Sequence, residues 1–271
     1  MTHIDGRPDG ASEISAEEIL ASHFSLISQP GTIDCVNIAG ADGWTSPHPH
    51  PVLSLMRWTT DDEAIATAAL DEVLERCGEM GHGFDWMTGP SCAKSGLLSL
   101  LESRGFVGPP LEVTAMVRAI APGEPLDQEA GIRIRKVSDH TDDRVWRLMA
   151  KGFDVPDEVG TIFHNAYMTS SPLQNSDVYV AMVDDDDTPV GVGYLSYIGT
   201  GPTVLLRVSC TEEGHRGRGI YRALVKRRLH DAAQQGRTHA FVHAYSEASM
   251  RGLSGLGFTD VGTLLLHRWR P

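Results

Sequence analysis

The stretch Arg216-Gly217-Arg218-Gly219-Ile220-Tyr221 lies between an apolar run, Val204–Val208, and a helix-like segment, Arg222–Ala233. This order indicates a strand, a glycine turn and the start of a helix. Backbone N–H groups and the positive end of a helix dipole converge at such a turn and attract an anion. The two glycines let a phosphate approach the backbone without a Cβ in the way, and the arginines add positive charge. The turn is therefore predicted to bind a phosphorylated ligand, and the alternative is a basic surface turn.

Two other phosphate-binding patterns are excluded. A nucleotide P-loop requires Gly-Lys-Ser/Thr, and a dinucleotide fold requires three spaced glycines followed by an acidic residue. The turn instead resembles motif A of the Gcn5-related N-acetyltransferase (GNAT) family, Arg/Gln-x-x-Gly-x-Gly/Ala, which holds the pyrophosphate of acetyl-CoA. Tyr221 departs from the small residue of that pattern. The residues that the resemblance implies for binding acetyl-CoA are Arg216, Gly217, Arg218, Gly219, Ile220, Tyr221 and Arg222.

A second segment, from Ser246 to Phe258, resembles motif B of the same family. Its ending Leu256-Gly257-Phe258 fits the family pattern. Ser246 stands where the family has asparagine and is taken as a further cofactor-binding residue. Leu253 stands at the position of the tyrosine commonly proposed to protonate the leaving thiolate. Because leucine has no proton to give, another hydroxyl or water must serve, or the chain binds CoA without efficient turnover.

Acetyl transfer needs a held thioester, an uncharged nucleophile and stabilisation of the oxyanion. In the family, the strand before the turn separates from its neighbour and presents free backbone N–H groups to the thioester. By position these residues are Ser209, Cys210 and Thr211. Cys210 could instead be a nucleophile, although a cysteine in an apolar strand is usually a small core residue.

A protonated alkyl amine has a pKa near 10.4, so a base must remove its proton before attack. Some family members place a glutamate on the strand before motif B, where this chain has Phe241. His243 lies two residues later on the same face and is the first candidate base. Glu212 is the second candidate, and Tyr245 is a candidate donor to the thiolate. Each also has a structural interpretation, as a packed or solvated side chain.

The composition is that of a globular protein with two domains. The 271 residues carry 41% hydrophobic and 22% charged residues and a formal net charge of −13, which disfavours nucleic-acid binding. No apolar run of about 20 residues or signal pattern is present, so no membrane association and a cytoplasmic location are expected. The four cysteines are expected to be reduced and mostly packed.

The order of segments predicts an α/β (α+β) fold of two GNAT-like domains, each a mixed, mostly antiparallel sheet flanked by helices. Leu97–Phe106, which ends Arg104-Gly105-Phe106, resembles the ending of motif B, and a strand follows each copy. The first copy lacks the glycine turn and is interpreted as degenerate. The predicted divisions are a flexible tail over 1–12, a degenerate GNAT-like domain over 13–120, a linker over 121–130 and an acetyl-CoA-binding GNAT domain over 131–271.

Individual elements follow from periodicity and turn residues. The expected helices are 15–28, 62–77, 95–104, 142–153, 157–168, 222–233 and the motif B segment. The expected strands are 35–39, 52–58, 84–87, 113–120, 132–135, 178–183, 190–198, 204–210, 240–245 and 263–269.

Two further clusters were considered as metal sites. His48-Pro49-His50-Pro51 has two imidazoles without a third ligand, and it is interpreted as a loop of the first half that could contact substrate. The four aspartates Asp184–Asp187 are interpreted as a solvated hairpin turn. No metal is expected.

The leading hypothesis is an acetyl-CoA-dependent N-acetyltransferase that acts on the amine of a small molecule by direct attack, as a monomer or homodimer. One alternative is a non-catalytic acyl-CoA-binding or regulatory module. Another is an acyltransferase that uses a longer acyl-CoA or a protein amine.

Overall fold

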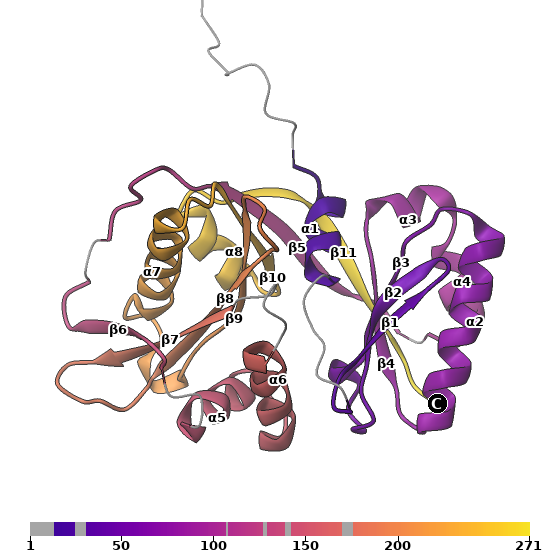
Figure 1. The fold of residues 1–271 in the computed structure, drawn as a ribbon, viewed down its shortest axis with the longest axis horizontal. Helices are drawn as coiled ribbons and strands as arrows, with labels where there is room; N and C mark the ends of the chain where they lie inside the picture. The colour runs from indigo at the N-terminus through magenta and orange to yellow at the C-terminus, as the bar shows by residue number, and fades with distance from the viewer. Residues whose placement is uncertain (1–13, 25–30, 107, 127–128, 139–141, 170–175) are drawn as a thin grey trace, which may run out of the picture.

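The computed structural model describes residues 14–24, 31–106, 108–126, 129–138, 142–169 and 176–271. The tail predicted for residues 1–12 lies outside them. The strands form one sheet in the order β1-β2-β3-β4-β11-β5-β10-β9-β8-β7-β6. Two groups of helices flank this sheet, one near each end (Figure 1). A mixed, mostly antiparallel sheet with flanking helices is the predicted fold class.

The C-terminal half of the sheet contains strands buried on both faces. Its strands are β6 (Ile132–Lys136), β7 (Ser176–Val183), β8 (Gly191–Tyr197), β9 (Thr203–Thr211) and β10 (His239–Ala244). Successive side chains of a strand point to opposite faces. Val178 and Val180 of β7 accordingly pack in one hydrophobic cluster, and Tyr179 and Ala181 pack in another.

Helices cover both of these faces. On one face α7 (Ile220–Gln234) packs Leu224 and Leu229 against the strands, and α8 (Glu247–Ser254) lies beside it. On the other face α5 (Asp143–Gly152) packs Leu148 and Met149 into the core, next to α6 (Asp157–Thr169). Each such apolar side chain contributes roughly 1.5–3 kcal/mol of burial.

The N-terminal half repeats part of this arrangement. Its strands are β1 (Asp34–Ile38), β2 (Ala41–Thr45), β3 (Leu55–Trp58) and β4 (Phe84–Thr88), and its helices are α1 (Ala16–Phe24), α2 (Glu63–Met80), α3 (Pro90–Ser95) and α4 (Leu98–Ser103). The strands β3 and β4 are parallel and joined by α2, as β9 and β10 are parallel and joined by α7. The two halves therefore share the order strand, helix, parallel strand, helix, strand.

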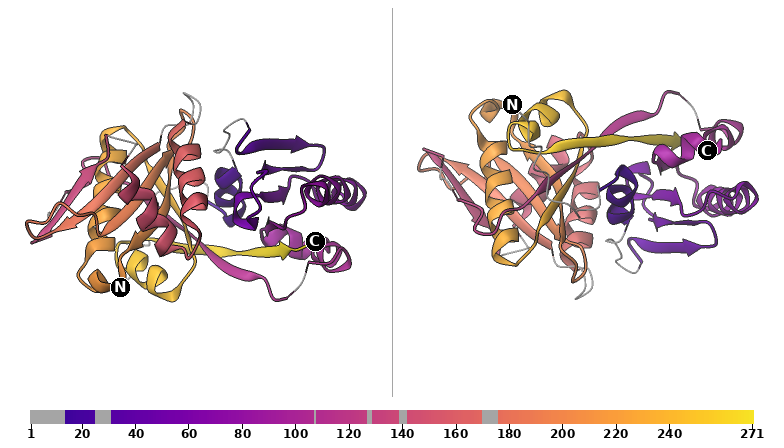
Figure 2. Two further views of the ribbon diagram at one scale, coloured as in Figure 1. Left: turned by 90° about the horizontal axis from the view of Figure 1, so that it is seen from below. Right: turned by 90° about the horizontal axis from the view of Figure 1, so that it is seen from above.

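The last strands of the two halves lie side by side between them. β5 (Leu111–Ala119) pairs with β10 of the C-terminal half, and β11 (Thr259–Trp269) pairs with both β5 and β4. Figure 2 shows β11 in yellow running from the C-terminal half to the chain end beside the N-terminal helices. The sheet thus crosses the predicted division at residues 121–130, because each half takes in the last strand of the other.

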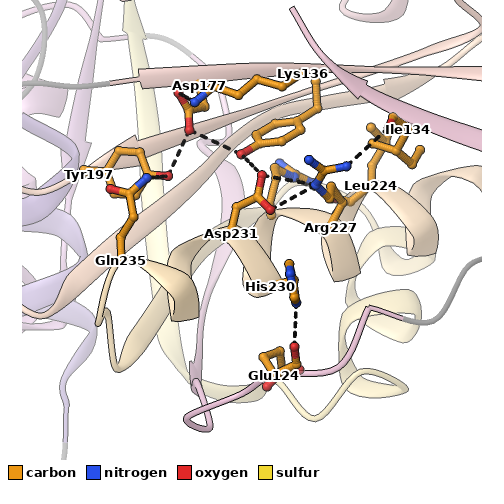
Figure 3. Close-up of polar contacts among 12 residues, drawn as sticks. Glu124, Ile134, Lys136, Asp177, Tyr197, Leu224, Arg227, His230, Asp231 and Gln235 are labelled. Atoms are coloured by element: carbon orange, nitrogen blue, oxygen red, sulfur yellow. Dashed lines mark hydrogen bonds and ion pairs between the residues drawn. The ribbon is translucent and has the colours of Figure 1, made fainter.

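A polar network holds α7 against β7 and β8 (Figure 3). Tyr179 Oη donates to Asp231 Oδ2 at 2.8 Å, and Tyr197 Oη donates to Asp177 Oδ2 at 2.9 Å. Gln235 Nε2 donates to the Tyr197 oxygen at 2.8 Å. Burial raises the pKa of both phenols, so they remain protonated donors. The network belongs to the framework of the fold and lies away from the cavity described below.

Two predicted elements differ from the structure, and the structure contains others that were not anticipated. The helix expected over 95–104 begins later, as α4 at Leu98, because Gly96, with a left-handed φ of 79°, ends a separate helix, α3, that was not expected. Residues 52–58 form a short 3-10 turn (Pro51–Leu53) followed by β3. β2 was not expected. Within the described residues, no helix is both long enough and apolar enough to cross a membrane.

Candidate active site

The glycine turn has the predicted conformation. Gly217 and Gly219 have φ of 78° and 86°, and a Cβ on Gly217 would meet nothing within 4 Å. Gly219 is the N-cap of α7, and no side chain caps this helix. The turn is exposed from Arg216 to Gly219. Its first-turn amides are thus accessible to a bulky anion.

The arginines around the turn already contact protein groups. Arg218 Nη2 lies 3.1 Å from Asp184 Oδ2, and Arg222 Nε lies 3.5 Å from Glu129 Oε1. Arg216 Nε donates to the carbonyl of Thr211 at 3.3 Å. Exposed ion pairs of this kind contribute about 0–1 kcal/mol. A diphosphate could therefore replace the carboxylates as the partner of these arginines.

Strands β9 and β10 separate at the site. Their parallel pairing ends at Leu206 and Val242, whereas β9 continues to Thr211. A bulge at Val208 marks the separation, since the register with β8 shifts there and the φ of this valine is 41°. A left-handed β-branched residue costs about 1–3 kcal/mol and is held by its surroundings.

The buried Arg228 of α7 supports this bulge. Its side chain is fully buried. Nη1 donates to the carbonyl of Tyr194 at 3.0 Å and to that of Arg207 at 3.3 Å, and Nη2 donates to Ser209 Oγ at 2.8 Å. Burial lowers the pKa of Arg228 to about 10. This arginine was not anticipated from the sequence, where it reads as one of many cations of α7.

The ladder between β8 and β9 orients the amides of the cofactor strand. Glu212 N donates to Val190 O at 2.8 Å. Amides alternate in direction along an antiparallel strand. The N–H groups of Ser209 and Thr211 therefore point toward the gap beside β10, and that of Cys210 points toward β8. Of the three predicted amides, two face the gap.

Cys210 is a core residue. Its thiol is buried and donates to Leu148 O at 3.3 Å. Burial raises the pKa of this thiol to about 12. A thiol that stays protonated is inert, so the environment of Cys210 favours the structural interpretation. None of the four cysteines, all of which lie within the described residues, forms a disulfide bond, and Cys35 is exposed.

A cavity of about 460 Å³ opens from the gap and lies between the two halves. Five of the predicted site residues line it: Ser209, Tyr221, His243, Tyr245 and Ser246. The other predicted residues, at the turn and at Cys210, Thr211 and Glu212, lie outside this lining. Much of the rest of the wall is apolar and comes from the N-terminal half, including Trp44, Leu55 and Met87.

His243 occupies the predicted position, but its electrostatic setting differs from the expected one. Its Nε2 is buried without a hydrogen-bond partner in the described part of the chain. Burial and the charge of Arg207 lower the pKa of His243 to about 3. The ring contacts that of His23 at a centroid distance of 4.7 Å and an interplanar angle of 42°, and the pKa of His23 is lowered by burial first and by Arg207 second. A neutral imidazole with such low basicity is a weak proton acceptor.

Arg207 is a charged residue of the cavity wall that sequence reasoning missed. It is 5% exposed, lines the cavity and donates from Nη2 to His23 O at 2.8 Å. The available signal was its charge, which stands alone within the apolar run Val204–Val208. A charge in such a run needs a polar environment.

Two candidates for proton transfer lie in different environments. Glu212 pairs with Lys151 at 3.0 Å and lies 3.5 Å from His215 Nδ1, outside the cavity. Tyr245 lines the cavity and is 43% exposed.

The Tyr221 ring packs on Gly252 of α8, and its hydroxyl lies 3.2 Å from Ser249 Oγ. The phenol of Tyr221 thus contacts α8 at the cavity wall.

Ser246 and Leu253 mark the ends of α8. Ser246 is the N-cap and its hydroxyl accepts from Ser249 N. Leu253 is fully buried. It therefore offers no group to the cavity, in agreement with its interpretation from the sequence.

Neither of the two clusters considered as metal sites brings together enough ligands, among the described residues, to hold a metal ion. No group of three or more potential metal ligands occurs in the part of the chain that the structure describes. His48 lies 3.6 Å from Glu158, and the Asp184–Asp187 turn contacts Arg133 and Arg218.

Comparison with known proteins agrees with this geometry. Residues 144–258 match the model of the acetyltransferase (GNAT) family, and the chain therefore contains a GNAT-family domain. None of the curated proteins matches the chain.

Solved structures share the fold over most of the chain. A GCN5-related N-acetyltransferase from Kribbella flavida is 15% identical, with a TM-score of 0.65 over 89% of this chain and 90% of that one. Another from Sphaerobacter thermophilus is 15% identical, with a TM-score of 0.61 over 86% and 82%. A tandem GNAT protein from the clavulanic acid biosynthesis pathway is 13% identical, with a TM-score of 0.61 over 93% and 87%. At these identities the likeness concerns the fold.

Proposed function

We propose that this protein is an acetyl-CoA-dependent N-acetyltransferase that acts on the amine of a small molecule. The observation that carries the proposal is the separation of β9 from β10 beyond Leu206, because residues beside this gap, Ser209 and His243, line the cavity between the halves. Acetyl-CoA would supply an activated acyl group as a thioester.

Residues of this chain fit such a donor. The uncapped amides of α7 and the left-handed glycines offer a diphosphate site with room around it. The gap-facing amides of Ser209 and Thr211 would stabilise negative charge on a carbonyl oxygen. Arg228 would position β8 and β9 at the bulge through its hydrogen bonds to both strands. The apolar walls would exclude water from the amine and the acyl carbon.

We also propose that the N-terminal half is a degenerate copy that shapes the acceptor cavity. Its α2 is capped by Asp62, whose carboxylate accepts from Ala64 N and Ile65 N. The same position on α7 is an uncapped glycine. A carboxylate on the helix N-terminus disfavours a second anion, so α2 would not hold a diphosphate in the way proposed for α7.

The buried Leu253 favours one other function, a non-catalytic acyl-CoA-binding module. Calorimetric titration with acetyl-CoA, followed by thiol-release assays over a panel of amines, separates the two. Binding with thiol release for at least one amine supports the enzyme. Binding without release for any amine supports the module, and absence of binding contradicts both.

A further inference from the structure

A pair of opposite charges lies in the part of the cavity wall that the N-terminal half builds. Asp85 of β4 and Arg268 of β11 stand directly opposite each other in the sheet, and both line the cavity. Asp85 is 2% exposed, and its two oxygens accept from Nε and Nη2 of Arg268 at 2.7 and 2.8 Å. The next cross-strand pair on the same face, Met87 and Leu266, is apolar and also lines the cavity. The charged pair therefore interrupts an apolar stretch of wall.

Asp85 occupies only one edge of the Arg268 guanidinium. A guanidinium presents its N–H groups along two edges of one plane, and Asp85 takes the edge formed by Nε and Nη2. Nη1 makes no hydrogen bond within the part of the chain that the structure describes, and 41% of the Arg268 side chain is exposed. The second edge, formed by Nη1 and Nη2, is thus open to a ligand. A carboxylate matches such an edge through two parallel hydrogen bonds.

Stability gives little reason for a charged pair at this place. Taking two charges out of water costs several kcal/mol for each ion, and apolar side chains of similar volume often stabilise a protein as well or better. Asp85 instead holds the guanidinium of Arg268 in one orientation. An arginine that is already oriented loses less conformational entropy when it binds a ligand. The pair is therefore suited to binding an anionic group inside the cavity.

We propose that the acceptor is an amine that also carries a carboxylate, and that this carboxylate binds the open edge of Arg268. The inference rests on the proposed acetyltransferase function and names its acceptor class. In the reaction the ammonium group first loses one proton to solvent. The amine nitrogen then bonds to the acetyl carbon, the C–S bond breaks, and a second N–H proton ends on the sulfur. The carboxylate is unchanged and serves only for binding.

Amino acids and the amines that their decarboxylation would give are matched substrates for a test with the full-length chain and acetyl-CoA. The pairs are leucine with 3-methylbutylamine, 4-aminobutanoate with propylamine, and 6-aminohexanoate with pentylamine, which place the carboxylate at increasing distances from the nitrogen. We expect kcat/KM for at least one amino acid to exceed that for its partner amine about 10- to 100-fold, as hydrogen bonds to a charged group contribute.

Two variants of the charged pair test whether Arg268 is the source of this preference. Asp85→Leu combined with Arg268→Leu removes both charges and leaves neither one buried without its partner. It should lower the ratio of kcat/KM for amino acid over amine about 10- to 100-fold. Arg268→Lys keeps a cation beside Asp85 but loses the planar edge, so it should lower the same ratio in a protein that retains an ion pair. Because each substrate keeps its intrinsic reactivity in every variant, a change in the ratio reports binding.

A second charged pair of the N-terminal half provides the matched control. Asp42 of β2 and Arg57 of β3 are also directly opposite in the sheet, and the carboxylate accepts from Nε and Nη2 at 2.7 and 2.8 Å. Both residues lie outside the lining of the cavity. Asp42→Leu combined with Arg57→Leu should therefore leave the ratio unchanged.

The outcomes separate this inference from the proposed function. Thiol release with the same ratio in the unmodified chain and in both Arg268 variants overturns the carboxylate inference and leaves the acetyltransferase function intact. A ratio near one for every substrate pair in the unmodified chain does the same. Thiol release with none of these substrates and with no amine in the wider panel contradicts both proposals.

Discussion

Arg228 lies against Gly193 at the point where the cofactor strand bulges. A Cβ on Gly193 would lie 2.9 Å from Cζ of Arg228. The absence of a side chain at Gly193 lets the guanidinium reach the carbonyls of Tyr194 and Arg207. The separation of β9 from β10 therefore depends on a helix residue and a glycine on the neighbouring strand.

Gly193→Ala should destabilise the fold by roughly 1–3 kcal/mol, because the added methyl group pushes the guanidinium away from its carbonyl partners. Urea unfolding measures this change. Gly214→Ala is the matched control, since its Cβ would meet nothing within 4 Å. Equal stability of the two variants would contradict the role assigned to the contact.

The elements that the sequence predicted well are those with strong local signals. The glycine turn, α7 and the apolar β7 and β8 follow from residue types within a few positions. β2 was missed because Ala41-Asp42-Gly43-Trp44-Thr45 lacks a regular apolar alternation. Its Gly43 is needed for contact with β3, since a Cβ there would lie 2.8 Å from the Met56 sulfur.

Contacts between residues far apart in the sequence could not be predicted from local patterns. The positions of β5 and β11 depend on pairing between the halves, and no local pattern encodes that choice. Likewise His243 lies on the strand where it was predicted, but its low pKa arises first from burial and second from Arg207, which reaches it from the bulged strand. Local periodicity places a residue on a face but does not reveal which charge lies opposite.

Gly219→Glu should abolish acetyl-CoA binding while the protein stays folded, because the carboxylate would occupy the anion site at the start of α7. The left-handed φ of 86° adds strain of about 1 kcal/mol for any side chain. Gly219→Ala carries the same strain without the charge and should retain binding within about tenfold. Calorimetry with acetyl-CoA, together with circular dichroism, distinguishes these effects. Retained affinity in the glutamate variant would refute the placement of the diphosphate.

Acidification should destabilise the protein through His243. The unfolded chain binds a proton at this residue below its ordinary pKa of about 6.5, whereas the folded chain resists protonation down to about 3. Stability is therefore lost as the pH falls from 6.5 toward 3. His243→Gln should reduce the loss between pH 7 and pH 5 by up to about 2 kcal/mol. Urea unfolding at several pH values measures the free energy of unfolding of both proteins. If this free energy fell equally with pH in the variant and the unmodified protein, His243 would titrate with its ordinary pKa.

Turnover should report on the same residue. Because His243 stays neutral from pH 6 to 8, its replacement by glutamine should leave the shape of the kcat profile unchanged in that range. A profile that loses a step near pH 6.5 in the variant would restore His243 as the general base.

Leu253 is buried and has no proton to give to the leaving thiolate. We expect the proton to come from a tyrosine elsewhere in the cavity wall. Tyr221 and Tyr245 both line the cavity, and the half-buried Tyr221 is oriented by Ser249 at 3.2 Å. We expect Tyr221→Phe to lower kcat about 10- to 100-fold with little change in acetyl-CoA affinity. Tyr245→Phe, at a more exposed ring, should have a smaller effect. The reverse order would assign the donor role to Tyr245, and unchanged kcat in both variants would leave protonation to solvent water.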